Sequence, residues 1–143
     1  HMLRRLAGDE PFFRGIKRFY TQSRYRKVGS EEFRLAMEAE TGLSLERFFE
    51  RWVYGSSLPR IVLSVRTEAS PTGSDAVLRF EQLGDVFDVP VTITLQYADR
   101  EAVTLVVPVR EQIVETRIAL AGPLRAVDVS KDDGVLVDVA RTP

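Results

Sequence analysis

The chain has 143 residues with 44% apolar and 29% charged side chains, a length and composition typical of a soluble globular protein of one ordinary domain or two small units. Its formal net charge of −1 gives no reason to expect a nucleic acid or an anionic membrane surface as a partner. It contains no cysteine, which excludes disulfides, thiolate metal sites and a cysteine nucleophile, and no apolar run approaches the roughly 18 residues that span a bilayer.

The first residues are typical of the end of a helix. His1-Met2 matches what remains after cleavage of an expression tag, so residues 1–2 are a tag remnant and we expect the natural chain to begin further upstream. Met2, Leu3 and Leu6 have helical spacing, and Gly8 is well placed to cap this helix at its C-terminus.

A second helix is predicted from Asp9, which can cap its N-terminus, with Pro11 tolerated in the first turn and an end near residues 24–27, before Gly29. One apolar stripe is expected along it, formed by Phe12, Phe13, Ile16, Phe19 and Tyr20. We interpret its basic residues as a solvated face opposite that stripe, with docking to an acidic partner as the alternative. They are Arg14, Lys17, Arg18, Arg24, Arg26 and Lys27.

Two further helices are expected before the pattern changes. Ser30 is predicted to cap the third, which ends at Gly42 and turns Phe33, Ala36 and Met37 to one side. Ser44 is predicted to start the fourth, which Gly55 stops. Its apolar residues fall at i, i+3, i+4, i+7 and i+8, and they are Leu45, Phe48, Phe49, Trp52 and Val53.

The helical segment is rich in aromatic residues for its size. It holds six of the eight phenylalanines and the only tryptophan, which we interpret as core-packing residues. Fewer than sixty residues of helix make a poor independent core, so we expect these helices to pack against something outside the chain, or to self-associate through exposed apolar surface.

After Pro59 the period of the apolar residues changes to two, which is typical of strands. Turns are predicted at residues 70–75, 98–101 and 131–134. Pro90 indicates an edge position or a bulge in its strand. The predicted strands begin near Ile61 and Ala76, cover residues 89–97, 103–109, 113–120 and 124–130, and end with Val135, Val137 and Val139.

About seven short strands in 84 residues predict an antiparallel β-sandwich of immunoglobulin-like or fibronectin-like size. The predicted fold class is therefore α+β by segments: a short helical bundle remnant over residues 1–59, followed by an all-β sandwich over residues 60–143. The charge is also uneven, with 11 Lys/Arg against 8 Asp/Glu before residue 60 and 9 against 13 after it, which supports two units of different character.

The residues themselves predict no catalytic, cofactor-binding or metal-binding site. The single histidine, His1, lies in the tag remnant, so neither a zinc motif of the HExxH kind nor a histidine base for a serine nucleophile is present. The three lysines, Lys17, Lys27 and Lys131, lie in no recognisable motif. The carboxylate pairs Glu31-Glu32 and Asp132-Asp133 are interpreted as helix-start and turn charges.

Three local patterns stand out in the helical part. They are Met2-Leu3-Arg4 followed by Gly8-Asp9-Glu10 and Phe12 or Phe13; Glu32-Phe33 with Met37-Glu38; and Thr41-Gly42 with Leu45, Phe48-Phe49, Trp52 and Pro59. Together they resemble the C-terminal part of the catalytic region in aminopeptidase N-like zinc metallopeptidases. "LRFEQ…DVPVTITLQYAD" and "AVDVSKDDGVL" are similar to strands of the β-sandwich that follows in that family. The resemblance covers nearly the whole chain and is most specific in the helical part.

The resemblance implies that residues 1–59 end a thermolysin-like catalytic domain and that residues 60–143 form the next domain. It also implies that the zinc ligands, the motif that recognises the substrate N-terminus and a catalytic tyrosine all precede Met2. Tyr20, Tyr25, Tyr54 and Tyr97 do not occupy the matching position, so none is given a catalytic role. The parent enzyme is expected to bind zinc and hydrolyse N-terminal peptide bonds.

The expected function of this chain is accordingly that of a non-catalytic C-terminal piece of a zinc aminopeptidase, whose sandwich acts as a structural brace or spacer. Its partners would be the remainder of the parent catalytic domain and, for the parent, a peptide substrate. One alternative is an interaction or adhesion module of a non-catalytic metallopeptidase relative, which would present a sandwich edge or loop. Another is an independent helical-plus-sandwich protein that self-associates through its phenylalanine stripes.

Overall fold

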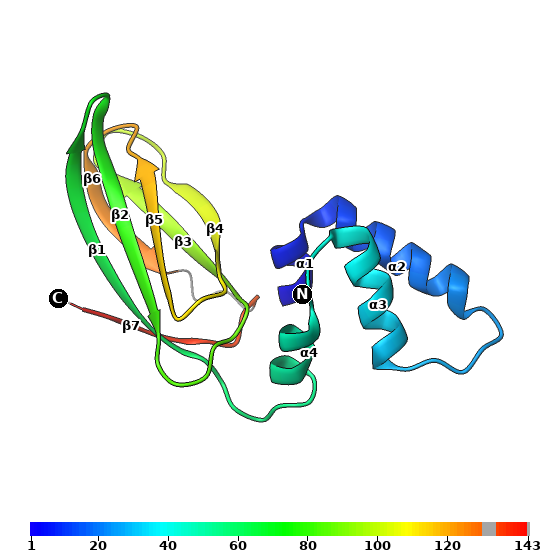
Figure 1. The fold of residues 1–143 in the computed structure, drawn as a ribbon. Helices are drawn as coiled ribbons and strands as arrows, with labels where there is room; N and C mark the ends of the chain where they lie inside the picture. The colour runs from blue at the N-terminus through cyan, green and yellow to red at the C-terminus, as the bar shows by residue number, and fades with distance from the viewer. Residues whose placement is uncertain (130–133, 143) are drawn as a thin grey trace. The chain divides into compact units, whose positions relative to one another are not determined.

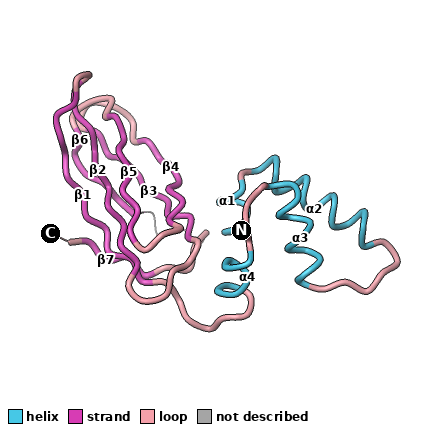
Figure 2. Tube along the Cα trace, viewed as in Figure 1, coloured by secondary structure: helices cyan, strands magenta, loops and turns pink. Residues whose placement is uncertain are grey.

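The computed structural model describes residues 1–129 and 134–142. The chain divides into two compact units, His1–Ser57 and Leu58–Pro143. All helices belong to the first unit and all strands to the second (Figures 1 and 2). Within the described residues there are four helices followed by seven strands in two sheets with a sandwich-like arrangement, so the predicted α+β class is confirmed.

Gly8 and Gly42 end the first and third helices, as the sequence predicts. Gly8 has φ 85°, a left-handed value that favours glycine, and its N–H donates to Arg4 O at 2.8 Å. Gly42 has φ 68° and its N–H donates to Glu38 O at 3.0 Å, which closes the third helix. The helices are α1 (Met2–Ala7), α2 (Asp9–Ser23), α3 (Ser30–Thr41) and α4 (Glu46–Trp52).

Three predicted helix starts are wrong by one or two residues. Asp9 and Ser30 are the first helical residues rather than caps, and α4 begins at Glu46 rather than at Ser44. The physical reason is that other side-chain bonds take over: the Asp9 carboxylate accepts from Arg4 at 2.8 Å, and Glu38 accepts the N–H of Leu45 before α4. The carboxylate of Glu32 accepts the N–H of Gly29 at 2.8 Å, so the Ser30 hydroxyl is not needed as a cap.

The helical unit has a small apolar core. α2 and α3 lie side by side (Figure 1) and approach closely at Gly15, where an added Cβ would lie 2.3 Å from Met37 Sδ. The core residues are Leu3, Met37, Leu45, Phe48 and Phe49, with Met2, Leu6, Phe12, Phe33, Leu43 and Trp52 partly buried against them. Val53, which the spacing predicts to extend the α4 stripe, is the C-cap residue of the helix and is exposed.

The second unit contains a four-stranded and a three-stranded sheet. The strand orders are β5-β2-β1-β7 and β4-β3-β6. Every pairing is antiparallel except that of β1 with β7, so the last strand joins the first rather than the sixth. The strands are β1 (Arg60–Ser70), β2 (Gly73–Gln82), β3 (Val89–Tyr97), β4 (Val103–Val109), β5 (Ile113–Ala119), β6 (Leu124–Val129) and β7 (Asp138–Arg141).

The last strand is shorter than its apolar alternation predicts. It begins at Asp138, so Val135 and Val137 lie outside it. In the parallel register, Asp138 is paired with Arg60, where β1 begins. Residues before Asp138 would face Pro59 and the linker, and proline has no N–H to donate. The predicted turn at residues 131–134 lies outside the described residues except for Gly134, as does the Asp132-Asp133 pair.

Pro90 lies in β3, which is the central strand of its sheet. At Pro90, however, β3 is paired with a neighbouring strand on one side only. β4 pairs with β3 from Val89 to Leu95, whereas β6 pairs only with residues 93–97. Pro90 stands directly opposite Pro108. Two residues without N–H groups fit opposite each other only as a non-hydrogen-bonded pair, so the ladder loses no bond there.

A buried glutamine connects the end of β2 to the loop that leads to β3. Gln82 is 1% exposed. Its Nε2 donates to Phe87 O at 2.8 Å and to Glu111 O at 3.2 Å, and its Oε1 accepts the N–H of Phe87 at 3.0 Å. One amide side chain therefore bonds two buried backbone groups of Phe87 and the partly buried carbonyl of Glu111, and it fixes the turn at residues 83–88.

Candidate functional site

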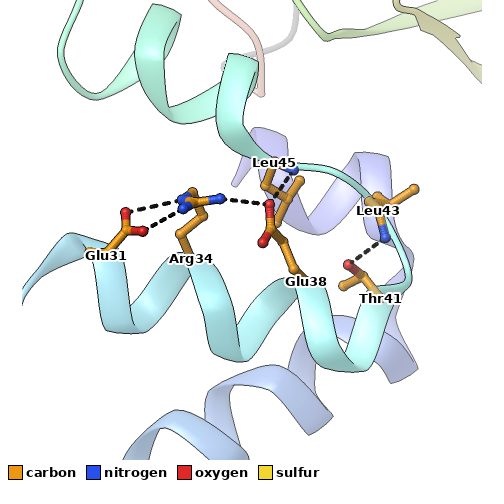
Figure 3. Close-up of polar contacts among 6 residues, drawn as sticks. All are labelled: Glu31, Arg34, Glu38, Thr41, Leu43 and Leu45. Atoms are coloured by element: carbon orange, nitrogen blue, oxygen red, sulfur yellow. Dashed lines mark hydrogen bonds and ion pairs between the residues drawn. The ribbon is translucent and has the colours of Figure 1, made fainter.

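The strongest polar cluster of the helical unit lies on α3 (Figure 3). Arg34 donates from Nε to Glu31 Oε2 at 3.1 Å and from Nη1 to Glu38 Oε1 at 2.9 Å, and its Nη2 also donates to Glu31. These bonds lower the pKa of Glu31, chiefly through the hydrogen bond from Arg34, and raise the pKa of Arg34. Glu31 and Arg34 therefore keep their charges, and neither is suited to general acid catalysis at neutral pH.

The same cluster holds the start of α4. Glu38 Oε1 also accepts the N–H of Leu45, the N-cap of α4, at 2.8 Å, and Thr41 Oγ1 accepts the N–H of Leu43 at 3.2 Å (Figure 3). The side chains of Arg34 and Glu38 are only 17% and 23% exposed. Because Glu38 joins two helices through one carboxylate, we assign the cluster a structural role.

Removing this carboxylate should loosen the helical unit. We expect Glu38→Ala to lower its stability by about 1–2 kcal/mol, because Arg34 and the Leu45 N–H lose an acceptor that is largely shielded from water. Glu38→Gln should cost less, since an amide oxygen still accepts the Leu45 N–H. Urea unfolding followed by Trp52 fluorescence measures both. Glu50→Ala, an exposed glutamate on α4, is the matched control, and an equal loss there would contradict the assignment.

The sequence predicts that the basic residues of α2 form one solvated face. In the structure they do not, because they divide into two groups. Arg14 Nε and Arg18 Nη1 lie 3.3 Å and 3.1 Å from the Glu40 carboxylate and link α2 to α3. Lys17 lies elsewhere on the helix and Arg24 directly follows it as the C-cap residue, and within the described residues neither has a carboxylate partner. α2 and its C-cap therefore carry two arginines that are engaged with α3 and two cations, Lys17 and Arg24, that are not.

The predicted apolar stripe of α2 is also divided. Phe12 and Phe19 are partly buried, and the ring of Phe19 packs edge-to-face on Phe33 of α3 at a centroid distance of 5.2 Å. Phe13, Ile16 and Tyr20 are 51%, 37% and 69% exposed. The physical reason is that adjacent positions of a helix are about 100° apart, so Phe12 and Phe13 cannot share a narrow face.

The exposed apolar residues and the unengaged cations lie together. Phe13, Lys17 and Tyr20 are spaced at i, i+4 and i+7, which places them along one line of the helix surface, with Ile16 beside them. Arg24, the C-cap residue after the helix, continues this spacing at i+11. We call these five residues the outer face of α2. Gly15, the residue that meets Met37, lies on the other side of the helix. The sequence signal for this face is the alternation of apolar and basic residues at helical spacing.

The residue that follows Arg24, Tyr25, adds a third aromatic ring beside Phe13 and Tyr20. Tyr25 is fully exposed and has φ 60°, the left-handed conformation that glycine or asparagine usually occupies after a helix. The Arg24 guanidinium lies 5.9 Å from the centroid of its ring. A shallow pocket of about 330 Å³ is lined by Phe19, Tyr20, Ser23, Arg24 and Tyr25. The outer face thus ends in an aromatic and basic hollow.

The sandwich unit offers weaker candidates. A hollow of about 530 Å³ lies between the β1–β2 turn and the β5–β6 loop, and it is lined by Thr67, Thr72, Gly73, Ser74 and residues 120–124, which carry no charge. β4 presents Val103 and Val106, 46% and 40% exposed, on an edge strand. Pro108 removes one donor from that edge, which limits strand addition by a partner.

Within the described residues there is no candidate metal-binding group and no helix that could span a membrane. In residues 1–129 and 134–142, no group of three or more His, Asp or Glu side chains is placed so that it could hold a metal ion. In the same residues, no helix has the length and apolar character needed to cross a bilayer. The outer face of α2 combines exposed apolar residues with cations that have no carboxylate partner in the described residues, and it is the best candidate for a functional surface there.

Comparisons with known proteins place the fold. No family model matches the sequence, and no curated protein matches it. A solved structure is similar: the crystal structure of Legionella pneumophila aminopeptidase A in complex with aspartic acid, at 19% sequence identity and a TM-score of 0.71. The match covers 96% of this chain and 17% of that one, so this chain spans about a sixth of its length. The likeness shows an aminopeptidase-like fold and nothing further.

Proposed function

We propose that this chain is the C-terminal end of the catalytic domain, together with the following β-sandwich domain, of an aminopeptidase N-like zinc metallopeptidase. Residues 1–59 would close the catalytic domain and residues 60–143 would form the sandwich. The observation that carries the proposal is the fold likeness to one part of an aminopeptidase over 96% of the chain, which coincides with the sequence patterns that resemble this family.

In this proposal the residues present have no catalytic role of their own. Zinc, when bound by the parent, would activate water for hydrolysis of the N-terminal peptide bond. The resemblance places the zinc ligands of the family before this segment, so we assign the residues present no zinc ligand and no step of the reaction. What they would contribute is support: the small core of α1, α3 and α4 and the sandwich with its Gln82 connection would brace the catalytic domain.

The test compares the complete natural protein with the 143-residue chain. The complete protein is expected to contain zinc and to release fluorophores from aminoacyl substrates, to lose this activity with a chelator, and to regain it with added zinc. The 143-residue chain, assayed with zinc alongside it, should show no hydrolysis. Hydrolysis by the 143-residue chain would contradict the proposal. A complete protein with neither zinc nor activity would favour an interaction module in a non-catalytic relative.

A further inference from the structure

We propose that the outer face of α2, together with Tyr25, is a docking surface for an amphipathic helix whose apolar stripe is flanked by carboxylates. The inference takes from the proposed function only that the helical unit has a partner outside residues 1–143. Three observations carry it: the exposure of the apolar residues, the charge beside them, and the conformation of Tyr25.

The first observation is the amount and continuity of apolar surface. Phe13, Ile16 and Tyr20 follow one another along the helix and are each more than one-third exposed. The ring of Phe13 is held in place, because Phe12 packs against it edge-to-face at 5.3 Å and the Arg4 guanidinium lies 4.9 Å from its centroid. A fixed apolar row of this length matches the i, i+3, i+4, i+7 anchors by which helices recognise one another.

The second observation selects the charge of the partner. Lys17 and Arg24 lie within the apolar row and have no carboxylate partner in the described residues, whereas Arg14 and Arg18 are engaged with Glu40 on α3. A partner with carboxylates beside its apolar stripe would neutralise both cations. Residues 1–57 carry 11 Lys/Arg against 8 Asp/Glu, so the unit as a whole also favours an acidic partner.

The same charges disfavour a second copy of the chain as the occupant. Lys17 lies midway between Phe13 and Tyr20. Two copies packed antiparallel through this face would bring their Lys17 ammonium groups together, and a parallel arrangement would align every cation with its counterpart. Like charges at such contacts are destabilising, so self-association through this face is expected to be weak at low ionic strength.

The third observation is that Tyr25 retains an exposed ring in a conformation where glycine would be more stable. A left-handed residue with a Cβ costs about 1–2 kcal/mol relative to its ordinary conformation. The ring makes no buried contact that offsets this cost, because Tyr25 is fully exposed. With Arg24 and Tyr20 it forms one wall of the 330 Å³ pocket, where an apolar side chain of a docked helix would fit.

Binding of designed peptides to the 143-residue chain tests the proposal. The probe is a fluorescent peptide of about 20 residues, long enough to form a helix, with leucines and phenylalanines on one face and flanking glutamates. One matched peptide has these glutamates replaced by lysines, and another has the same composition scrambled. We expect the acidic peptide to bind at least about tenfold more tightly than either, and its affinity to fall as salt rises from about 0.05 to about 0.5 M.

Variants of the chain locate the surface. Lys17→Glu with Arg24→Glu should weaken binding at least about tenfold, whereas Arg60→Glu with Arg125→Glu, which makes the same charge change on exposed residues of the sandwich unit, should not. Tyr25→Gly should raise the melting temperature and yet weaken binding, a combination that misfolding cannot produce. Equal binding of the acidic and basic peptides, or unchanged binding by both the charge variant and Tyr25→Gly, would overturn the proposal.

Two other results would also count against it. Association of the chain with itself through this face, strengthened by salt and abolished by Tyr20→Ser, would make a second copy the occupant. Binding of the scrambled peptide as tightly as the helical one would indicate nonspecific adsorption. These outcomes leave the zinc assay of the complete protein untouched, so the docking surface and the proposed function can fail separately.

Discussion

Gln82→Leu is expected to destabilise the sandwich unit by about 3–5 kcal/mol. The leucine would leave the buried N–H and C=O of Phe87 without their present partner, and each such group costs about 1–3 kcal/mol, while the partly buried carbonyl of Glu111 would lose a bond as well. This is a large part of the stability of a small domain. Chemical denaturation monitored by circular dichroism measures the loss. Gln96→Leu, a half-buried glutamine on β3, is the matched control and should change stability by about 0.5 kcal/mol or less.

A second variant keeps the prediction testable if the leucine form does not fold. In Gln82→Glu an ionised carboxylate would face the Phe87 and Glu111 carbonyl oxygens, which now accept from Nε2 at 2.8 Å and 3.2 Å. Burial beside these oxygens should raise the pKa of that glutamate, because the protonated form can donate to one of them. Its penalty should therefore be smallest at acid pH and grow as pH rises through the raised pKa. A penalty independent of pH would contradict the assigned hydrogen bonds.

Gly15→Leu is expected to destabilise the helical unit by about 2–3 kcal/mol, although leucine is the better helix former. A Cβ at this position would lie 2.3 Å from Met37 Sδ and 3.2 Å from its Cε, and Met37 is fully buried. The Met37 side chain must therefore move into space that other core residues occupy. Thermal unfolding of the variant against Thr21→Leu, which introduces the same side chain at an exposed position of α2, measures the effect.

A double variant identifies the cause of this loss. If the clash is with Met37, then Met37→Ala should make room for the leucine, and Gly15→Leu with Met37→Ala should lose less stability than the sum of the two single changes. Strict additivity, or a Gly15→Leu protein as stable as the parent, would show that α2 and α3 do not approach each other at this point.

The features that the sequence predicts well are those with local causes. Gly8 and Gly42 end helices because a positive φ favours glycine whatever surrounds it. The strands of the sandwich follow from apolar alternation, which is clearest in β3, where Val91, Ile93 and Leu95 are fully buried. These signals need no knowledge of distant residues, and they were sufficient for the fold class.

The features that the sequence does not predict depend on partners far along the chain. Gln82 bonds to Glu111, 29 residues away, and Glu38 caps α4 across a glycine, so neither side chain is distinctive within its own segment. The length of β7 is set by Pro59, nearly eighty residues earlier. A residue whose role is fixed by such a contact can be recognised only when the contact is seen.

The outer face of α2 could be predicted from the sequence only in part. The basic residues of α2 allowed an acidic partner as an alternative, but helical spacing alone assigned Phe12 and Phe13 to one stripe. Only packing shows that Phe12 and Phe19 lie toward α3 while Phe13 and Tyr20 remain exposed. Close approach at Gly15 decides which side of α2 is turned inward, and the residue that it meets, Met37, is 22 positions away.

The central claim is that the helical unit is the incomplete end of a larger domain, and hydrogen exchange of residues 9–28 tests it most directly. The amides of this segment are to be compared between the 143-residue chain and the complete natural protein, with residues 89–97 of β3 as the internal control. The account predicts exchange at least about tenfold slower in the complete protein for residues 9–28, with β3 unchanged. Equal exchange of residues 9–28 in both proteins would contradict it.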